Sequence, residues 1–354
     1  MNLQELGWSP FFNAAFERLA EPGCLPGRVA VQIISGKYLV YCDEGEVQGE
    51  ITGRLQYLAS GPEDLPAVGD WVAVRIIPSE RRAVIVDLLP RRTKFSRRAA
   101  GKRAEEQVVA ANVDVVFLVQ ALDSTLNLRR LERYLVVASD SGARPVVLLN
   151  KSDLCENLDA VRVAVERVAA GAPVHVLAAR HGLGLDALNE YLAEGVTGAV
   201  LGSSGVGKST IINRMLGSDY LPTEEVRDFD DKGMHTTMRR ELVILPGRGL
   251  LIDTPGMREL QLLGGTEGLE AAFEDVEALA LECKFRDCRH DEEPGCAVRR
   301  ALDDGHLPLE RFASYRKLLR EITFLERSGN RTEQTLYKDR VKKLTARHKR
   351  GYKK

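Results

Sequence analysis

The stretch "GSSGVGKST" at residues 202–210 decides the fold of this chain. Gly202, any four residues and then Gly207, Lys208 and Ser209 match the phosphate-binding loop completely, a motif that joins a strand to a helix. The apolar letters "AVL" precede the stretch and "STIINRML" overlaps its end. They predict the required strand and helix, so we expect the centre of the chain to bind nucleotide phosphates.

The expected phosphate contacts follow from the chemistry of this loop. Glycines let backbone N–H groups close around phosphate oxygens, and the N-terminus of the next helix adds positive potential. We expect Lys208 to reach the β- and γ-phosphates and Ser209 to ligate Mg²⁺. The predicted phosphate site consists of Gly202, Ser203, Ser204, Gly205, Val206, Gly207, Lys208, Ser209 and Thr210.

Two other motifs also follow buried strands. In "LLIDTPG", Asp253 can hold Mg²⁺ through water, and the Gly256 N–H can sense the γ-phosphate. In "NKSD", at residues 150–153, Asp153 offers two acceptor oxygens to the N1–H and N2–H₂ donors of guanine. Adenine lacks this donor pair, so Asp153 predicts selection of GTP over ATP.

The rest of the base site is predicted from the same strand ends. Asn150 suits guanine N7 and the neighbouring loops, and the stem of Lys151 can cover the base. The later "LAAR" stretch contains Ala178 and Ala179, and the Ala179 N–H can bind guanine O6. NKSD alone is a weak signal, but four motifs that each end a strand are a strong one.

The pattern of apolar runs predicts three domains. Strands such as "VDVVFLVQA" and "PVVLLNKSD" alternate with helical segments, which indicates a doubly wound α/β domain over 112–262. Five short strands predict an all-β OB-fold barrel over 28–92. A structural barrel without a ligand is the alternative, although the adjacent basic run "RRTKFSRRAAGKR" favours RNA contact.

The remaining segments flank these domains. We expect an N-terminal extension over 1–27, a basic linker over 93–111, a mostly helical metal-binding domain over 263–330 and a basic tail over 331–354. The tail is too charged to form a core alone, so it is either a solvated or disordered segment or in contact with RNA.

Three of the six cysteines cluster with a histidine. The spacing Cys283-x4-Cys288-x-His290-x5-Cys296 supplies three thiolates and one imidazole. Four such ligands form a closed tetrahedral set, which predicts one structural zinc ion rather than a catalytic one. Free, reduced cysteines are the alternative.

Composition limits the protein class only loosely. The formal net charge is −1, so the total indicates neither a nucleic-acid nor a membrane partner. No apolar run approaches the roughly 20 residues of a membrane span, and the N-terminus does not resemble a signal peptide. We therefore expect a cytoplasmic protein.

The segment between the phosphate loop and Asp253 has the composition of a switch. The stretch "YLPTEEVRDFDDKGMHTTM" is long, polar and glycine-bearing. We expect Thr236, or less favourably Thr237, to complete the Mg²⁺ shell when GTP is bound.

The order of these motifs differs from that of an ordinary GTPase. NKSD and LAAR precede GSSGVGKST, HTT and DTPG, and this order resembles the circularly permuted GTPases. With the barrel and the cysteine cluster, nearly the whole chain resembles the ribosome small-subunit-dependent GTPase family (RsgA, also called YjeQ). The resemblance implies a barrel, a permuted GTPase domain and a zinc domain. It also implies GTP hydrolysis stimulated by the 30S subunit and its 16S rRNA during late assembly.

The resemblance also suggests how hydrolysis occurs. Met257 stands where Ras-like proteins place the glutamine that orients water. The family is thought to use the switch histidine instead, here His235, whose imidazole can orient or deprotonate water. Lys208 and Thr236 complete the expected catalytic set. The alternative is that His235 only packs or faces solvent.

The permuted order suggests that the nucleotide state is coupled to the position of the metal-binding domain. The segment after DTPG runs directly through "MRELQLL" into the metal-binding domain, so the γ-phosphate state could move that domain. A nucleotide-switched RNA-binding module with negligible turnover is an alternative function. A P-loop metabolic kinase is a third, but NKSD and DTPG together disfavour it. We expect a monomer.

Overall fold

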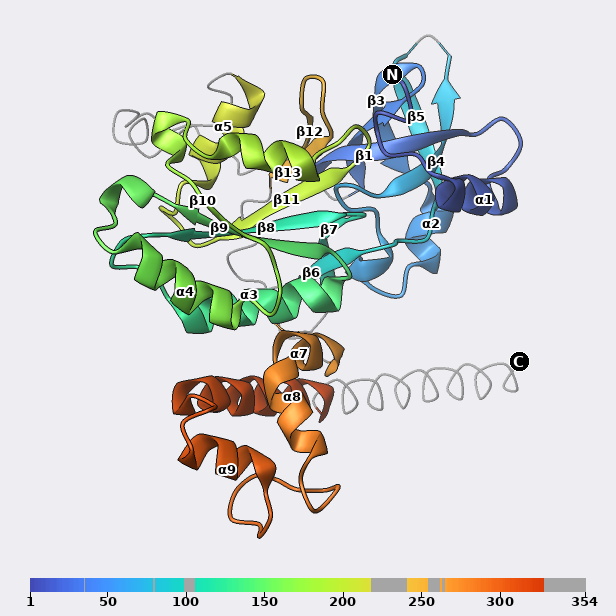
Figure 1. Ribbon diagram of the computed structural model, residues 1–354. Coiled ribbons are helices and arrows are strands. Elements are labelled where there is room, and N and C mark those ends of the chain that lie inside the picture. The colour runs from blue at the N-terminus through green and yellow to red at the C-terminus, as the bar shows by residue number, and fades with distance from the viewer. Residues whose placement is uncertain are drawn as a thin grey trace, which may run out of the picture. The chain divides into compact units, whose positions relative to one another are not determined.

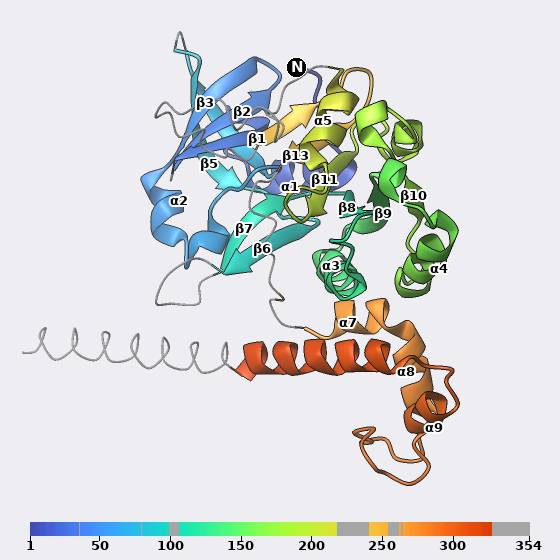
Figure 2. The same ribbon diagram turned by 90° about the vertical axis from the view of Figure 1, so that its left-hand side faces the viewer.

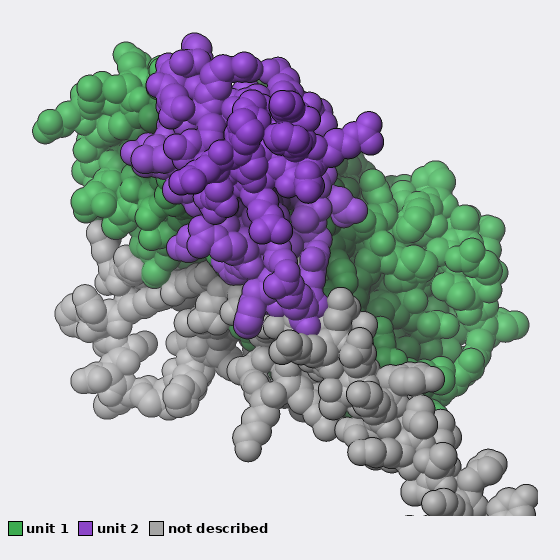
Figure 3. Space-filling model, turned by 90° about the horizontal axis from the view of Figure 1, so that it is seen from below, with its two compact units in different colours: residues 1–99, 105–261 green, residues 100–104, 262–354 purple. Residues whose placement is uncertain are grey.

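The computed structural model describes residues 1–34, 36–78, 80–98, 106–217, 241–253, 262 and 265–327. The chain divides into two compact units, coloured separately in Figure 3. The first contains residues 1–99 and 105–261, and the second contains residues 100–104 and 262–354. Among the helices in the described part of the chain, none is long and apolar enough to cross a membrane.

The first unit begins with the predicted five-stranded barrel. Its strands are β1 (Leu25–Ile34), β2 (Lys37–Cys42), β3 (Gly45–Ile51), β4 (Trp71–Ile77) and β5 (Arg82–Leu88). All neighbours are antiparallel except β3 and β5, and the pairing of β1 with β4 closes the barrel. Alternate residues such as Val29, Val40 and Ile85 fill its core. The OB-like barrel is therefore confirmed.

Short helices cover part of this barrel. They are α1 (Pro10–Leu19), α2 (Gly53–Leu58) and the 3₁₀ turn η1 (Pro62–Asp64). The ring of Trp8, just before α1, lies 4.7 Å from the fully buried Trp71 ring of β4. The apolar face of the N-terminal segment is thus anchored to the barrel, which the predicted N-terminal extension did not anticipate.

The segment predicted as a basic linker contains two strands. β6 (Lys94–Arg98) and β7 (Glu106–Ala111) form an antiparallel pair. Lys94 Nζ lies 2.7 Å from Glu106 Oε1 across this pair, so part of the basic run is neutralised by the opposite strand. The sequence showed the charges, but it did not show which strand would oppose them.

The predicted α/β domain forms the other part of the first unit. Its strands are β8 (Val115–Ala121), β9 (Arg144–Asn150), β10 (Val174–Val176), β11 (Thr197–Gly202), β12 (Glu241–Ile244) and β13 (Leu250–Asp253). They lie in the order β10-β9-β8-β11-β13-β12, and only β12 is antiparallel to its neighbour.

Helices cover both faces of this sheet. Figures 1 and 2 show α3 (Leu128–Ser141) and α4 (Leu158–Val168) on one face and α5 (Lys208–Leu216) on the other. Short 3₁₀ turns lie at η2 (Ser152–Leu154), η3 (Ala179–His181) and η4 (Leu185–Tyr191). Because β8, β9, β11 and β13 are parallel, their carboxyl ends meet at one edge of the sheet, which is where this fold binds ligands.

Barrel and α/β domain share one continuous sheet. Strand β12 pairs with β13 on one side and with barrel strand β1 on the other. Glu241, at the start of β12, is in register with both Asp253 and Val31. The barrel is thus joined through a single strand to the strand that ends in Asp253.

The second unit is helical, as predicted. It contains α7 (Glu267–Ala272), α8 (Glu274–Leu281), α9 (Ala297–Asp303) and a helix over residues 309–327. Arg311 is almost fully buried, pairs with Asp275 at 2.8 Å and stacks over the Phe273 ring at 4.0 Å. This paired charge fixes the long helix against α7 and α8.

Candidate functional site

The phosphate loop joins β11 to α5, as the sequence predicts. Gly207 caps α5 in the left-handed region with φ 97°, and a Cβ there would clash with the Asn150 amide. A Cβ at Gly202 would lie 2.6 Å from the Val119 carbonyl oxygen. Both positions therefore require glycine, because either side chain would push the loop away from the strand ends.

The charged and hydroxyl groups of the loop lie at its ends. Lys208 Nζ donates to the carbonyl oxygens of Gly202, at 2.9 Å, and of Ser203, so its ammonium lies within the loop. Ser209 and Thr210 form the first turn of α5, while Val206 is buried in the core beneath the loop. Ser204 and Gly205 form the exposed turn of the loop.

Asn150 connects the segments predicted to recognise the base to the phosphate loop. Its Nδ2 donates to the Val206 carbonyl at 2.8 Å, and its Oδ1 accepts from the Ala179 N–H at 3.0 Å. The side chain is almost fully buried. The sequence placed Asn150 against neighbouring loops, and the structure shows which loops they are. Ala178 lies beside them, bridged through its backbone to Leu183.

Lys151 and Asp153 lie on the turn after β9. Lys151 has a left-handed backbone with φ 64°, and its Nζ lies 2.9 Å from Asp123 Oδ2. Asp153 is partly exposed, and its Oδ2 lies 3.6 Å from His181 Nε2. This accessible carboxylate follows the base-recognition strand, in the position from which it could bind the guanine edge.

Asp253 ends β13, on the other side of the phosphate loop. Burial raises the pKa of this carboxyl to about 6, and the charge of Glu241 adds to the increase while Lys208 opposes it. A cation next to the carboxylate would favour its charged form. The residue is therefore suited to hold a hydrated Mg²⁺ beside bound phosphates. Three predicted residues, His235, Thr236 and Gly256, lie outside the described residues.

The structure adds two residues that the sequence analysis did not identify. Asp123 contacts Lys151, and Arg130 Nη1 donates to Ser203 Oγ. Asp123 follows β8 almost directly, so its strand-end position was a signal that could have identified it. Arg130 lies within a helix among other charged residues, and the sequence alone gives no sign that it reaches the loop.

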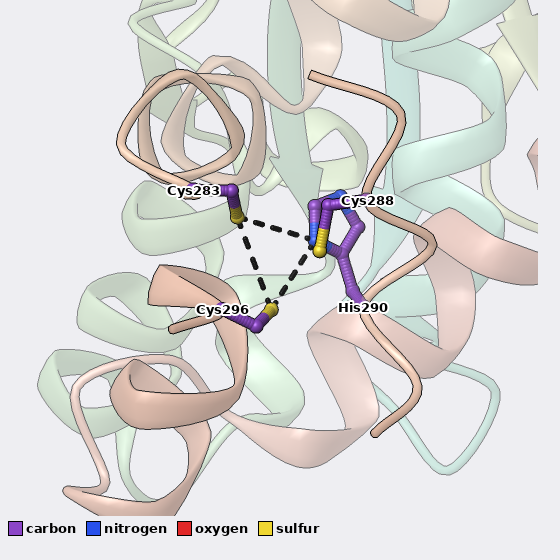
Figure 4. A group of neighbouring side chains, drawn as sticks. All are labelled: Cys283, Cys288, His290 and Cys296. Atoms are coloured by element: carbon purple, nitrogen blue, oxygen red, sulfur yellow. Dashed lines mark hydrogen bonds between the residues drawn. The ribbon is translucent and has the colours of Figure 1, made fainter. Parts of the chain in front are cut away.

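The predicted metal ligands converge in the second unit. Figure 4 shows Cys283, Cys288, His290 and Cys296 around one point, and their ligand atoms all lie within 4.8 Å of one another. His290 Nδ1 lies 3.6 Å from Cys283 Sγ and 3.4 Å from Cys296 Sγ. Four donors that converge in this way can hold a single metal ion.

The surroundings of His290 and Cys296 favour the forms of these side chains that bind a metal, whereas burial raises the pKa of the Cys288 thiol to about 11. Burial lowers the pKa of His290, which favours the neutral imidazole that a metal requires. The Arg299 N–H donates to Cys296 Sγ at 3.3 Å, at the start of α9. This donor stabilises a thiolate and orients it toward the other ligands.

Known proteins share both the sequence and the fold. A family model described as RsgA GTPase matches residues 88–263. The small ribosomal subunit biogenesis GTPase RsgA of Opitutus terrae is 49% identical over 353 residues, covering 97% of this chain and 96% of the relative.

Two solved structures have a similar fold. YjeQ from Thermotoga maritima is 27% identical with a TM-score of 0.62, covering 85% of this chain and 99% of that one. YloQ, titled a circularly permuted GTPase, is 23% identical with a TM-score of 0.61, covering 85% of this chain and 95% of that one. At this identity, the similarity to YloQ shows only that the fold is shared. The chain belongs to the RsgA GTPase family and is a circularly permuted, GTP-hydrolysing enzyme.

Proposed function

We propose that this enzyme hydrolyses GTP during maturation of the small ribosomal subunit, and that the subunit stimulates the hydrolysis. The observation that carries the proposal is the buried Asn150 side chain, which joins the phosphate loop to the LAAR segment. This contact makes the separate motifs one nucleotide site. The relative from Opitutus terrae is named for small ribosomal subunit biogenesis, which supports the choice of partner.

Within this site each residue has a proposed role. Asp153 binds the guanine N1–H and N2–H₂ groups. The Ala179 N–H, which donates to Asn150 Oδ1 in the nucleotide-free structure, would turn to O6 when the base binds. Lys208 binds the β- and γ-phosphates, and backbone N–H groups of the loop surround them. Ser209 and Thr236 would hold Mg²⁺ directly and Asp253 through water, which neutralises phosphate charge.

His235 is the proposed catalytic residue for hydrolysis. Met257 cannot orient water, so intrinsic turnover is expected to be slow. The imidazole of His235, adjacent to Thr236 in sequence, can accept a proton from water or hold it in line with the γ-phosphate. In this proposal, the subunit stimulates turnover by positioning His235.

The metal cluster is proposed to hold one structural zinc ion. Its donor set of three sulfur atoms and one imidazole nitrogen fits zinc, and no position remains for substrate. When bound, the ion would fix the loop between α8 and α9 and so shape the surface of the second unit. The ion is not proposed to take part in hydrolysis.

The proposed partner is the ribosomal RNA of the small subunit. The barrel, the basic residues near 91–103 and the C-terminal basic residues could bind its phosphates and shape. A solvated C-terminal tail remains the alternative for the last of these. We further propose that the protein acts in the cytoplasm as a monomer.

Multiple-turnover GTP hydrolysis, measured with and without 30S subunits, tests the proposal. The expected result is slow turnover alone and a large increase with 30S, whereas 50S subunits give no increase. Lys208→Ala serves as the control for contaminating GTPases, because it should remove both rates. Negligible turnover with 30S present would instead favour the nucleotide-switched RNA-binding module.

A further inference from the structure

The segment between β8 and the first turn of α3 touches both halves of the nucleotide site. This segment, residues 122–130, is called the brace below. The parallel pairing of β8 and β9 ends at Ala121 and Asn150, and the Leu122 N–H then donates to the Asn150 carbonyl at 2.8 Å. Backbone contacts alone therefore place the start of the brace beside the NKSD turn.

Asp123 holds Lys151 at the base side of the site. Its Oδ2 lies 2.9 Å from Lys151 Nζ, and its Oδ1 accepts from the Thr125 N–H and hydroxyl. The hydrogen bond from the Thr125 hydroxyl has the largest effect on the pKa of Asp123, and together with the contact to Lys151 it lowers this pKa to about 2. The carboxylate is thus charged and fixed, and it limits where the lysine stem can lie.

Arg130 holds the phosphate side. Asn127 caps α3 by accepting the Arg130 N–H at 3.0 Å, which fixes the start of the helix. From there the guanidinium donates to Ser203 Oγ, while the Ser203 carbonyl accepts from Lys208. Ser203 is therefore held from two sides by two cations.

We propose that the brace positions the two halves of the GTP site separately: Asp123 places Lys151 over the base, and Arg130 places the phosphate loop through Ser203. This proposal rests on the GTP site proposed above. Both are positioning residues, because neither is required to touch the nucleotide. Loss of Asp123 should weaken guanine-nucleotide binding, whereas loss of Arg130 should slow phosphate transfer.

A double-mutant cycle tests the base half. Asp123→Asn keeps the size of the side chain and its Thr125 contacts but removes the charge that holds Lys151. We expect about tenfold weaker GDP binding by calorimetry, since a partly exposed charged hydrogen bond is lost. The turnover number at saturating GTP should stay within about twofold, because the phosphate groups are untouched. In a Lys151→Ala background, Asp123→Asn should have no further effect.

A second cycle tests the phosphate half. Arg130→Gln should lower the 30S-stimulated turnover number by about tenfold, because a small displacement of the phosphate loop misaligns the γ-phosphate. Arg130→Lys, which keeps a cationic donor, should recover much of this loss. In a Ser203→Ala background, Arg130→Gln should have little further effect. Matched controls are Asp159→Asn and Arg162→Gln, both on the exposed surface of α4.

The possible outcomes are distinct. Additive losses in either cycle would overturn the brace, because the residue would not act through its partner. Unfolding of the nearly isosteric Asp123→Asn variant would also overturn it, since the residue would then be needed for the fold itself. A wild-type protein that neither prefers guanine nucleotides nor hydrolyses GTP would refute the proposed function instead. Wild-type activity with additive cycles would refute only the brace.

Discussion

The nucleotide site and the metal cluster are built in opposite ways. The nucleotide loops lie far apart in sequence, at Asn150, Gly202 and Asp253, and meet because parallel strands end together. The metal ligands Cys283 and Cys296 are only 13 positions apart and lie on a loop between two short helices. A sheet can hold its site before a ligand binds, whereas a short loop depends on its ion to hold its shape.

Removal of the metal should therefore produce the largest local effect. Combined Cys283→Ser and Cys288→Ser changes should reduce the metal content from about one zinc per chain to none. Structural zinc in small domains contributes about 10–16 kcal/mol of apparent binding free energy, so the loop between α8 and α9 should lose its fold. Elemental analysis and limited proteolysis measure the two effects.

The same double variant also tests whether the nucleotide site is built independently of the metal cluster. GDP affinity should remain within about twofold of wild type, because the phosphate loop is supported by buried strands and not by the metal. Unchanged metal content would refute the cluster as the zinc site. A large loss of GDP affinity would show that the two sites are not built independently.

Much of this architecture was predictable because its signals are local. Five barrel strands, four strand-end motifs and four metal ligands each appear as short patterns. The pairing of β12 with β1 was not predictable, because a four-residue strand carries no information on which edge it meets. For the same reason, the contact between Arg130 and Ser203 is visible only once helix α3 has been placed beside the phosphate loop.

The next largest effect concerns catalysis. His235→Ala should lose most of the 30S-stimulated turnover, by about 10²- to 10⁴-fold if the imidazole acts as general base. Binding of GDP should be retained, because the base and phosphate contacts come from other residues. Stopped-flow phosphate release with calorimetric binding separates these effects. Stimulated turnover at the wild-type rate would eliminate His235 as the catalytic residue.

Base selection should be affected less, although still clearly. Asp153→Asn replaces an acceptor with an amide donor that faces the guanine N–H groups. We expect GTP to lose about 2–3 kcal/mol of binding free energy, as for a charged hydrogen-bond partner that is removed. XTP, which presents an acceptor in place of the 2-amino donor, should gain relative to GTP. An unchanged ratio of the two affinities would be incompatible with the base-reading role.

The pKa of Asp253 predicts a smaller effect on stability. Burial raises this pKa to about 6, well above the value of about 3.9 that an aspartate has in an unfolded chain. Above pH 6 the carboxylate is charged in both states and destabilises the nucleotide-free fold. Well below pH 4 it is protonated in both states, so the cost disappears.

Asp253→Asn should therefore raise the free energy of unfolding of the nucleotide-free protein by no more than about 3 kcal/mol at pH 7.5, and much less near pH 4. The same change should weaken Mg²⁺-dependent GTP binding. Urea unfolding at the two pH values tests this sign. A destabilised variant at pH 7.5 would show that the carboxylate is better compensated than its burial indicates.

We propose that the nucleotide site controls binding to the small subunit. The strand between residues 241 and 244 joins both Asp253 and the barrel, and the chain after Asp253 leads to the second unit. Through either connection, a change at the γ-phosphate could move a surface that contacts RNA. By linkage, if the subunit favours the GTP-bound conformation, GTP must favour subunit binding by the same factor.

Co-sedimentation with 30S subunits at fixed salt, with GDP and with a non-hydrolysable GTP analogue, measures this coupling directly. A typical coupling of about 1–3 kcal/mol predicts roughly 5- to 150-fold tighter binding with the analogue. Affinity in both states should fall as salt rises, because basic side chains displace counterions from RNA. Equal affinity for 30S in the two nucleotide states would contradict the account.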